Sequence, residues 1–298
     1  MRRDKGNSPK NKKSIVEFIS MFQNRKLLIA TKHQKESVIA PILEKELGVS
    51  CFTDEDFDTD ALGTFTGEIE RELDPISTAR EKCLRAMKLN NCNLGVASEG
   101  SFGPHPSMFF INADDEFLIF IDTKNNIEVI VRELSTSTNF NGRQIQTQKE
   151  LFEFAEQVGF PAHGLILRKS KDENTDIHKG ITESEILQKS FNHFFSKYNS
   201  VYAETDMRAM YNPTRMSVIE KATQKLAQKI KSTCPQCQMP GFGITEAKSG
   251  LKCSLCGSPT NSTLSYIYVC QHCKFTKEDL YPHKKTTEDP TYCDYCNP

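Results

Sequence analysis

The hydrophobic and polar positions along the chain follow two periods, one typical of strands and one typical of helices. The apolar run 27–30 predicts a short buried strand, and apolar residues at helical spacing follow it directly. Gly48 is a natural end for that helix, and Pro41 inside the pattern predicts a kink or a restarted helix. Asp74 and Pro75 form an N-cap and first-turn pair, so a second helix is expected to begin there.

Further apolar runs of strand length follow in the middle of the chain. They lie at residues 94–97, 108–111, 117–121 and 127–131. Helices are predicted at 149–158 and 183–195, with a strand at 164–167 between them, and a long last helix begins at Asn212 and Pro213. Strands and helices mixed in this way predict an α/β domain with a mixed sheet.

Composition and length favour three parts: a disordered basic tail over 1–13, an α/β domain over 14–231 and a small cysteine-rich module over 232–298. With 37% hydrophobic and 26% charged residues, the chain has a globular composition. Every apolar run is shorter than the roughly 20 residues of a membrane span. The apolar stretch 15–22 contains Glu17, unlike a signal-peptide core, so a cytoplasmic protein that does not contact membranes is expected.

The end of the chain carries eight cysteines in four Cys-x-x-Cys pairs, a spacing typical of zinc ligands. The pairs are Cys234 with Cys237, Cys253 with Cys256, Cys270 with Cys273, and Cys293 with Cys296. Eight thiolates predict a double zinc ribbon with two four-cysteine sites, which are structural because four thiolates leave no open position for water. The separations favour sequential pairing, the first pair with the second and the third with the fourth, with a cross-braced arrangement as the alternative.

The charge of this module argues against nucleic acid as its partner. From residue 232 onward there are six lysines and no arginine against six acidic residues, so the module lacks a basic footprint. The whole chain is equally balanced, with a formal charge of -1. A role in holding the fold, in self-association or in binding a protein partner is therefore the better interpretation.

Three stretches of the α/β domain carry residues suited to phosphate or metal chemistry. The first runs from Thr31 to Lys35 and fits a capping box with Thr31 as N-cap. First-turn amides with Lys32 and Lys35 beside them would form an anion site suited to phosphate. An ordinary surface helix with exposed lysines is the alternative.

The second consists of two acidic segments taken together, residues 95–106 and 58–71. Glu99 stands at the end of a buried strand and is followed by Gly100, an arrangement suited to a metal ligand or a general base. Magnesium needs only one or two carboxylates besides water and substrate phosphates. Glu68 and Glu70 alternate across Ile69 and are the predicted companions of Glu99, although all three could simply face solvent.

The third stretch lies at the start of the last helix. Asn212 caps this helix and places Arg215 in its first turn, where a cation opposes the helix dipole. An anion should compensate for Arg215. Either Glu204 or Asp206 provides it, or Arg215 faces the phosphate or purine ring of a ligand.

Short motifs occur in the order found in one known superfamily. They are Thr31-Lys-His-Gln-Lys35, Thr78-Ala-Arg-Glu-Lys82-Cys83, the strand ending at Glu99, Gly159-Phe-Pro-Ala-His163-Gly164, and Asn212-Pro-Thr214-Arg215. Together they resemble the inosine-triphosphate pyrophosphatase-like superfamily of house-cleaning nucleoside-triphosphate pyrophosphatases. Two departures stand out: the single Glu99 replaces paired aspartates, and Thr214 replaces the serine-histidine of the last motif.

This resemblance implies a magnesium-dependent hydrolase of a nucleotide or a related phosphate compound. In that interpretation Glu99 is the catalytic acid, with Glu68 or Glu70 as its partner at the metal. The residues that would bind substrate are Thr31, Lys32, Lys35, Phe160, His163, Asn212 and Arg215. The alternative is a non-catalytic adaptor, in which the α/β domain senses a ligand and the zinc module docks a protein.

The chain also resembles an uncharacterised bacterial family of unknown function. Its signatures are residues 97–106 (ASEGSFGPHP), 206–209 (DMRA) and the terminal Cys-Asn-Pro. This resemblance implies no chemistry.

Overall fold

The computed structural model describes residues 21–57, 73–171 and 173–298. The expected tail over 1–13 and the candidate acids Glu68 and Glu70 lie outside these residues. The chain forms two compact units, of which one contains Met21–Lys124 and Ile130–Ala227 and the other contains Asn125–Val129 and Gln228–Pro298.

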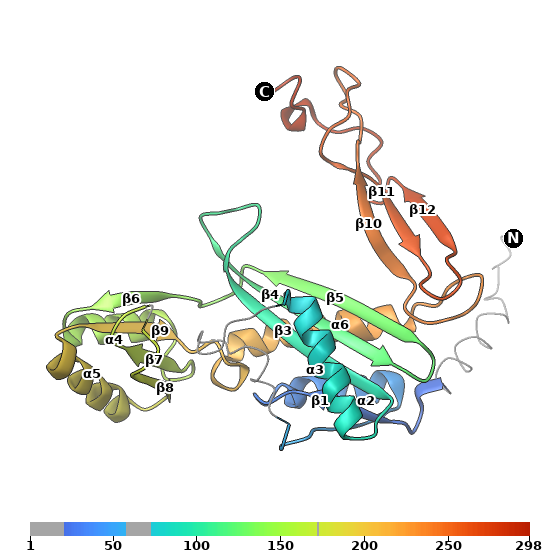
Figure 1. Cartoon of the computed structure of the whole chain (residues 1–298). Coiled ribbons are helices and arrows are strands. Elements are labelled where there is room, and N and C mark those ends of the chain that lie inside the picture. The colour runs from blue at the N-terminus through green and yellow to red at the C-terminus, as the bar shows by residue number, and fades with distance from the viewer. Residues whose placement is uncertain (1–20, 58–72, 172) are drawn as a thin grey trace, which may run out of the picture. The chain divides into compact units, whose positions relative to one another are not determined.

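A five-stranded mixed sheet forms the centre of the first unit (Figure 1). Its strands are β1 (Lys26–Ala30), β2 (Ser50–Phe52), β3 (Leu94–Pro104), β4 (Asn112–Asp122) and β5 (Ile127–Ser135). Their order is β2-β1-β3-β4-β5, and β1 is parallel to β2 and β3 while β3 is antiparallel to β4. The predicted mixed-sheet α/β fold is therefore confirmed.

The first unit also contains helices α2 (Glu36–Leu47) and α3 (Pro75–Leu89). Helix α6 (Pro213–Lys231) lies in this unit as far as Ala227. The predicted cap of α3 is confirmed, because Asp74 accepts hydrogen bonds from the amides of Ile76 and Ser77 at 3.0 and 3.1 Å. Gly48 ends α2 with a φ of 68°. Of the two outcomes expected at Pro41, the restarted helix is wrong, because α2 runs through the proline without interruption.

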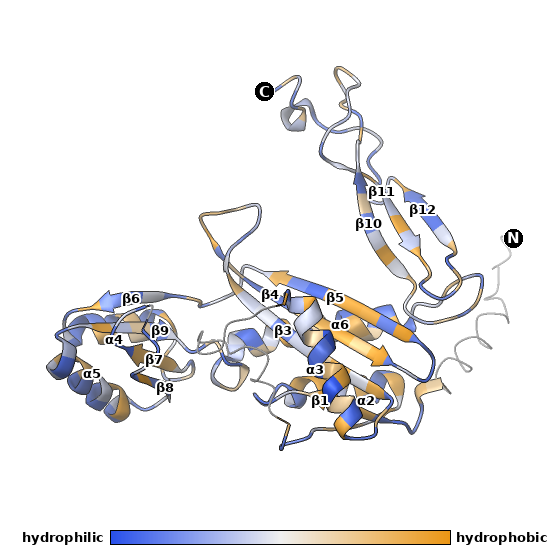
Figure 2. Cartoon of the chain, viewed as in Figure 1, coloured by the Kyte–Doolittle hydropathy of each residue, from blue (hydrophilic) through white to orange (hydrophobic). Residues whose placement is uncertain are grey.

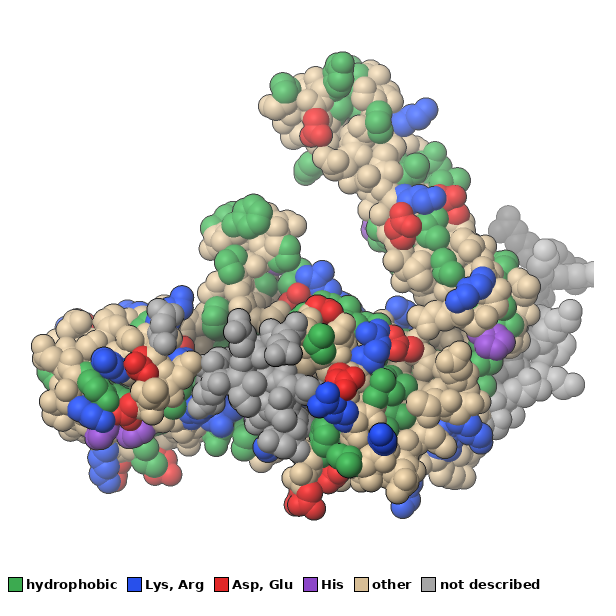
Figure 3. Space-filling view, in the orientation of Figure 1, with side chains coloured by type: hydrophobic (Ala, Val, Ile, Leu, Met, Phe, Trp, Pro, Cys, Tyr) green, Lys and Arg blue, Asp and Glu red, His purple; other side chains and the backbone are tan. Residues whose placement is uncertain are grey.

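The predicted strand at 108–111 is also wrong. Strands β3 and β4 are longer than the apolar runs suggested and pair from Leu94 opposite Asp122 to Pro104 opposite Asn112. Residues 105–111 connect them, and their apolar side chains gather at the tip of this connection (Figure 3). Phe109 and Phe110 are 77% and 89% exposed, so this apolar run does not mark a buried element.

A separate four-stranded sheet follows, in the order β6-β9-β7-β8. Its strands are β6 (Gly142–Ile145), β7 (Leu165–Arg168), β8 (Ile177–Ile181) and β9 (Val201–Thr205), with helices α4 (Gln148–Gln157) and α5 (Ser184–Tyr198) and the short turn η2 (Ala209–Tyr211). Both helices mix hydrophobic and hydrophilic residues (Figure 2), and Phe154 and Phe194 are buried in the core of this sheet. The predicted helices and strand of this region are confirmed.

The second unit contains the cysteine module. An antiparallel sheet of β10 (Gly243–Ser249), β11 (Thr263–Val269) and β12 (Thr276–Leu280) is followed by the short turn η3 (Pro290–Tyr292). Among the described residues of the whole chain, no helix is long and apolar enough to cross a membrane.

Candidate functional site

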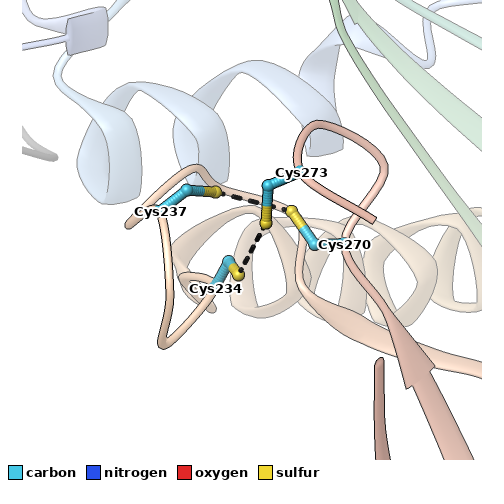
Figure 4. Close-up of side chains that lie close together, drawn as sticks. All are labelled: Cys234, Cys237, Cys270 and Cys273. Carbon is cyan, nitrogen blue, oxygen red and sulfur yellow. Dashed lines mark hydrogen bonds between the residues drawn. The ribbon is translucent and has the colours of Figure 1, made fainter. Parts of the chain in front are cut away.

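The eight paired cysteines form two groups of four. In each group the four sulfurs lie within 4.8 Å of one another. The Sγ atoms of Cys234 and Cys273 are 3.7 Å apart, and those of Cys237 and Cys270 are 3.6 Å apart (Figure 4). A tetrahedral zinc site with Zn–S bonds of about 2.3 Å spaces its sulfurs about 3.8 Å apart, far beyond a disulfide bond. This first group therefore has the dimensions of a zinc site.

The second group has the same dimensions. It consists of Cys253, Cys256, Cys293 and Cys296, with Sγ distances of 3.8 Å between Cys253 and Cys296 and 3.6 Å between Cys256 and Cys293. The two tetracysteine groups can hold two zinc ions, with all eight predicted ligands in place.

The expected sequential pairing of the cysteine pairs is wrong, and the cross-braced alternative is the one observed. Strand register is the cause. Gly243 at the start of β10 lies opposite Val269 at the end of β11, which brings the first cysteine pair to the third. Cys253 in turn forms a β-bridge with Glu288, which brings the second pair to the fourth.

The first-turn anion site expected at Thr31 is not formed as predicted. Helix α2 begins at Glu36 with Lys35 as its N-cap, because Gln34 has a φ of 58° and separates Thr31 from the helix. The Thr31 hydroxyl accepts a hydrogen bond of 3.5 Å from the amide of His33, and Lys32 is exposed.

Lys35 instead points into the protein. Its side chain is buried, with the residue 7% exposed, and Nζ donates a hydrogen bond of 2.9 Å to the Ser98 hydroxyl on β3. Burial lowers the pKa of Lys35 to about 8, and the cation of Arg215 acts in the same direction. A buried lysine with so low a pKa, whose Nζ donates to a neutral hydroxyl, is poised to interact with an anion.

Arg215 is buried beside a carboxylate from a distant strand. Its Nε donates to Glu116 Oε1 on β4 at 2.6 Å, and its Nη1 donates to the carbonyl of Met207 at 2.6 Å. The guanidinium carbon lies 5.1 Å from the centre of the Phe102 ring. Asn212 caps α6 as predicted, since its Oδ1 accepts from the amide of Arg215 at 3.0 Å.

The anions expected to compensate for Arg215 have other partners. Asp206 accepts from Arg208 at 2.6 Å, and Glu204 is paired with Arg168. Glu116 is the compensating anion instead. Sequence reasoning missed it because residues 112–116 were placed outside any strand. The only signal at this position is that three consecutive acidic residues, 114–116, directly precede the apolar run that begins at Phe117.

Asp114 and Glu116 lie two residues apart on β4, and their side chains therefore share one face of the sheet. Both are fully buried. Among the residues that the structure describes, both carboxylate oxygens of Asp114 and Oε2 of Glu116 have no hydrogen-bond partner. Burial, which is the main cause, and the nearby charge of Glu116, which is the second, together raise the pKa of Asp114 to about 8.

Gly100 makes room for this arrangement. It lies opposite Glu116 in the β3–β4 register, and a Cβ at this position would collide with the Glu116 carboxylate and the Arg215 guanidinium. A residue without a side chain is therefore required where the two charged groups meet the strand.

Glu99, the predicted catalytic acid, points the other way. Ser98 and Glu99 are neighbours on β3, so their side chains point to opposite faces of the sheet. Glu99 forms a buried ion pair with Lys82 of α3. The two faces still interact electrostatically, because the charges of Glu99 and Lys82 both affect the pKa of Lys35.

The structure thus brings Lys35 and Arg215 together on one face, with Glu99 within electrostatic range behind the strand. We refer to Lys35, Ser98, Asp114, Glu116 and Arg215 as the buried charge cluster. The remaining predicted substrate residues lie outside it. Phe160 packs against the core of the four-stranded sheet, and His163 Nε2 lies 2.8 Å from the Thr214 hydroxyl. The side-chain amide of Asn212 donates to Asn139 at 2.8 Å.

A further group of possible ligands lies on β8 and α5. Ligand atoms of Asp176, His178 and His193 lie within 4.8 Å of one another. The carboxylate of Asp176 already accepts from Lys197 at 2.8 Å and from Tyr198 at 2.7 Å, and these bonds lower the pKa of Asp176 to about 2. The Asp176 carboxylate is therefore already paired with a cation of the protein, the ammonium group of Lys197.

The fold and these groups define an α/β protein with a mixed central sheet and a module that can bind two zinc ions. The chain belongs to the family described as "Domain of unknown function (DUF6671)", which matches residues 82–298. No curated protein matches the chain. Membership agrees with the expected uncharacterised family, while the pyrophosphatase-like resemblance stays a prediction.

The cross-braced arrangement predicts a specific metal content. A double variant with Cys253→Ser and Cys296→Ser removes two ligands from one site, so it should retain one zinc per chain against two in the natural protein. Sequential pairing would instead place one of these residues in each site and damage both. Elemental analysis of the purified proteins, with Cys51→Ser as the control that keeps two zinc ions, separates the two arrangements.

The buried charge cluster predicts stability effects of opposite sign. Glu116→Gln should lower the free energy of unfolding by about 3 kcal/mol, because it leaves a buried guanidinium without its anion. Asp114→Asn should raise it by about 1 kcal/mol or more at pH 8. The folded protein keeps the Asp114 proton up to a pKa of about 8, whereas the unfolded chain releases it near 3.8. The contribution of Asp114 to the free energy of unfolding therefore falls as the pH rises from about 3.8 to about 8.

Urea denaturation at pH 6 and pH 8 measures both effects. The advantage of Asp114→Asn should be greater at pH 8. Asp115→Asn is the matched control, because its more exposed pair with Arg132 contributes at most about 1 kcal/mol. If Asp114→Asn lowered the free energy of unfolding at both pH values, that result would contradict this account of the cluster.

Proposed function

We propose that this protein is a metal-dependent hydrolase of a nucleotide or a related phosphate compound. One observation carries the proposal: Lys35 and Arg215 are buried beside Asp114 and Glu116 on one face of the sheet, although they come from distant parts of the chain. Ionisable groups with strongly shifted pKa values gather at functional sites more often than elsewhere. The order of short motifs that resembles the pyrophosphatase-like superfamily gives independent support.

The charges of this face favour an anionic ligand. At neutral pH Lys35 and Arg215 are cationic, whereas Asp114 keeps its proton because its pKa is about 8. Only Glu116 then opposes two cations. Lys82 and Glu99 neutralise each other behind the strand. The excess positive charge in a poorly solvated site is suited to phosphate, which an arginine fork and a lysine ammonium both bind well.

The side chains divide the work of binding and catalysis in this proposal. Lys35 and Arg215 hold the phosphate and neutralise charge that develops on it during hydrolysis. Glu99 is a positioning residue that keeps the Lys82 ammonium next to β3. A divalent metal supplies further charge neutralisation and a more acidic bound water. The zinc module is structural, because each zinc ligand set is complete with four thiolates.

The proposal predicts that the purified protein with Mg²⁺ releases phosphate or pyrophosphate from at least one member of a broad nucleotide panel. Lys35→Met should reduce kcat/KM by about 100-fold or more, because a fixed charge in a dry site contributes strongly to the transition state. Lys45→Met, which removes an exposed lysine from the same helix, is the matched control. Release that is absent from the whole panel, or unchanged in Lys35→Met, would overturn the proposed function.

A further inference from the structure

Three neighbouring carboxylate oxygens on the face of the buried charge cluster have no partner among the described residues. They are Oδ1 and Oδ2 of Asp114 and Oε2 of Glu116. Both residues are 0% exposed. Buried polar atoms of native proteins almost always have a partner, and an unpaired one requires an explanation. Three such atoms on two adjacent side chains of one strand face point to a ligand that the chain alone does not supply.

The protein fixes these oxygens in place. Arg215 Nε holds Glu116 through Oε1 at 2.6 Å, which leaves Oε2 as the open atom of that carboxylate. Asp114 follows the strand alternation and shares the face of Glu116. The neighbouring Asp115 points to the other face, where Arg132 binds both of its oxygens at 2.7 and 2.8 Å. The unpartnered state is therefore a property of this face and not of the acidic segment as a whole.

The chemistry of the open atoms selects the ligand. Two carboxylates that offer only oxygen atoms suit a hard divalent cation such as Mg²⁺ or Mn²⁺, whereas the thiolate groups of the cysteine module suit zinc. We infer that Asp114 and Glu116 form a binding site for one divalent cation, Mg²⁺ or Mn²⁺, on the face that also carries Lys35 and Arg215. This assignment differs from the sequence prediction, which placed the metal at Glu99 with Glu68 or Glu70.

Charge balance adds a consequence that rests on the proposed function. With a cation bound, both carboxylates are ionised and balance Lys35 and Arg215, so the metal itself contributes an excess charge of two. A phosphate group can neutralise that excess and supply further oxygen ligands, as substrate phosphates do at many magnesium sites. The cation and a phosphate compound should therefore bind cooperatively.

Titration of the zinc-loaded full chain with Mn²⁺, followed by the loss of the free-ion electron paramagnetic resonance signal, tests the site without any need for turnover. One Mn²⁺ per chain should bind, and inorganic pyrophosphate should lower its Kd by about tenfold or more. Asp114→Asn and Glu116→Gln should each raise the Kd by at least about tenfold, because each removes an anionic ligand. Asp115→Asn is the matched control and should bind as the natural protein does.

The variant Asp114→Glu controls for a loss of Mn²⁺ binding that is caused by misfolding. It keeps the carboxylate and should retain Mn²⁺ binding that Asp114→Asn loses, while both variants keep the cooperative unfolding of the natural chain. The inference is overturned if the natural protein binds no Mn²⁺, or if Asp114→Asn binds it unchanged.

Failure of this site and failure of the proposed function are distinguishable. Mn²⁺ binding that depends on Asp114, without hydrolysis of any phosphate compound, leaves the site standing and removes the function. The opposite result is metal-dependent hydrolysis in which Mn²⁺ binding is unchanged in Asp114→Asn and abolished in Glu99→Gln. That result removes the site at Asp114 and Glu116 but leaves the proposed function standing.

Discussion

The burial of the Arg215 guanidinium against Glu116 is the constraint on which the rest of the α/β domain depends. An arginine that is 2% exposed must find its anion and its acceptors inside the protein. Strand β4 supplies the anion, the segment before α6 supplies the Met207 carbonyl, and β3 supplies the Phe102 ring and the open space at Gly100. The pair therefore ties the last helix to the centre of the sheet. A structural ion pair alone would not need the unpartnered Asp114 beside it.

The cysteine module satisfies a separate constraint by a different kind of bond. Its sheet is small, and β10 is largely exposed along its length. For a module with so little apolar core, metal bound by the two cysteine groups would supply much of the folding energy. In the cross-braced arrangement each four-cysteine group combines one Cys-x-x-Cys pair with another that lies more than 30 residues later in the chain.

The sequence allowed the prediction of elements and residue types wherever one local interaction decides the outcome. Asp74 and Asn212 were recognised as caps because capping depends on a side chain and the next three amides. The eight zinc ligands were recognised because the spacing within each pair carries the chemistry. Lys35, Glu99 and Arg215 were selected as chemically unusual, and in the structure the charges of Glu99 and Arg215 both act on Lys35.

Features that depend on long-range register could not be predicted in this way. The pairing of the cysteine pairs follows from Gly243 lying opposite Val269, which no local pattern encodes. Glu116 was missed because the apolar run that predicts this strand begins only at Phe117, whereas β4 starts at Asn112 and includes the acidic residues. The orientation of Glu99 away from Arg215 depends on a single-residue difference along β3, the smallest change that moves a side chain to the other face of a sheet.

The central claim is that the buried face of Lys35 and Arg215 is a site for a metal and a phosphate rather than a closed set of ion pairs. Anomalous X-ray diffraction from crystals grown with Mn²⁺ and inorganic pyrophosphate tests it most directly. The account predicts a manganese peak within about 2.5 Å of carboxylate oxygens of both Asp114 and Glu116, with pyrophosphate oxygens in contact with Lys35 or Arg215. A manganese peak at Glu99 on the opposite face, or a cluster that binds neither ion, would contradict it.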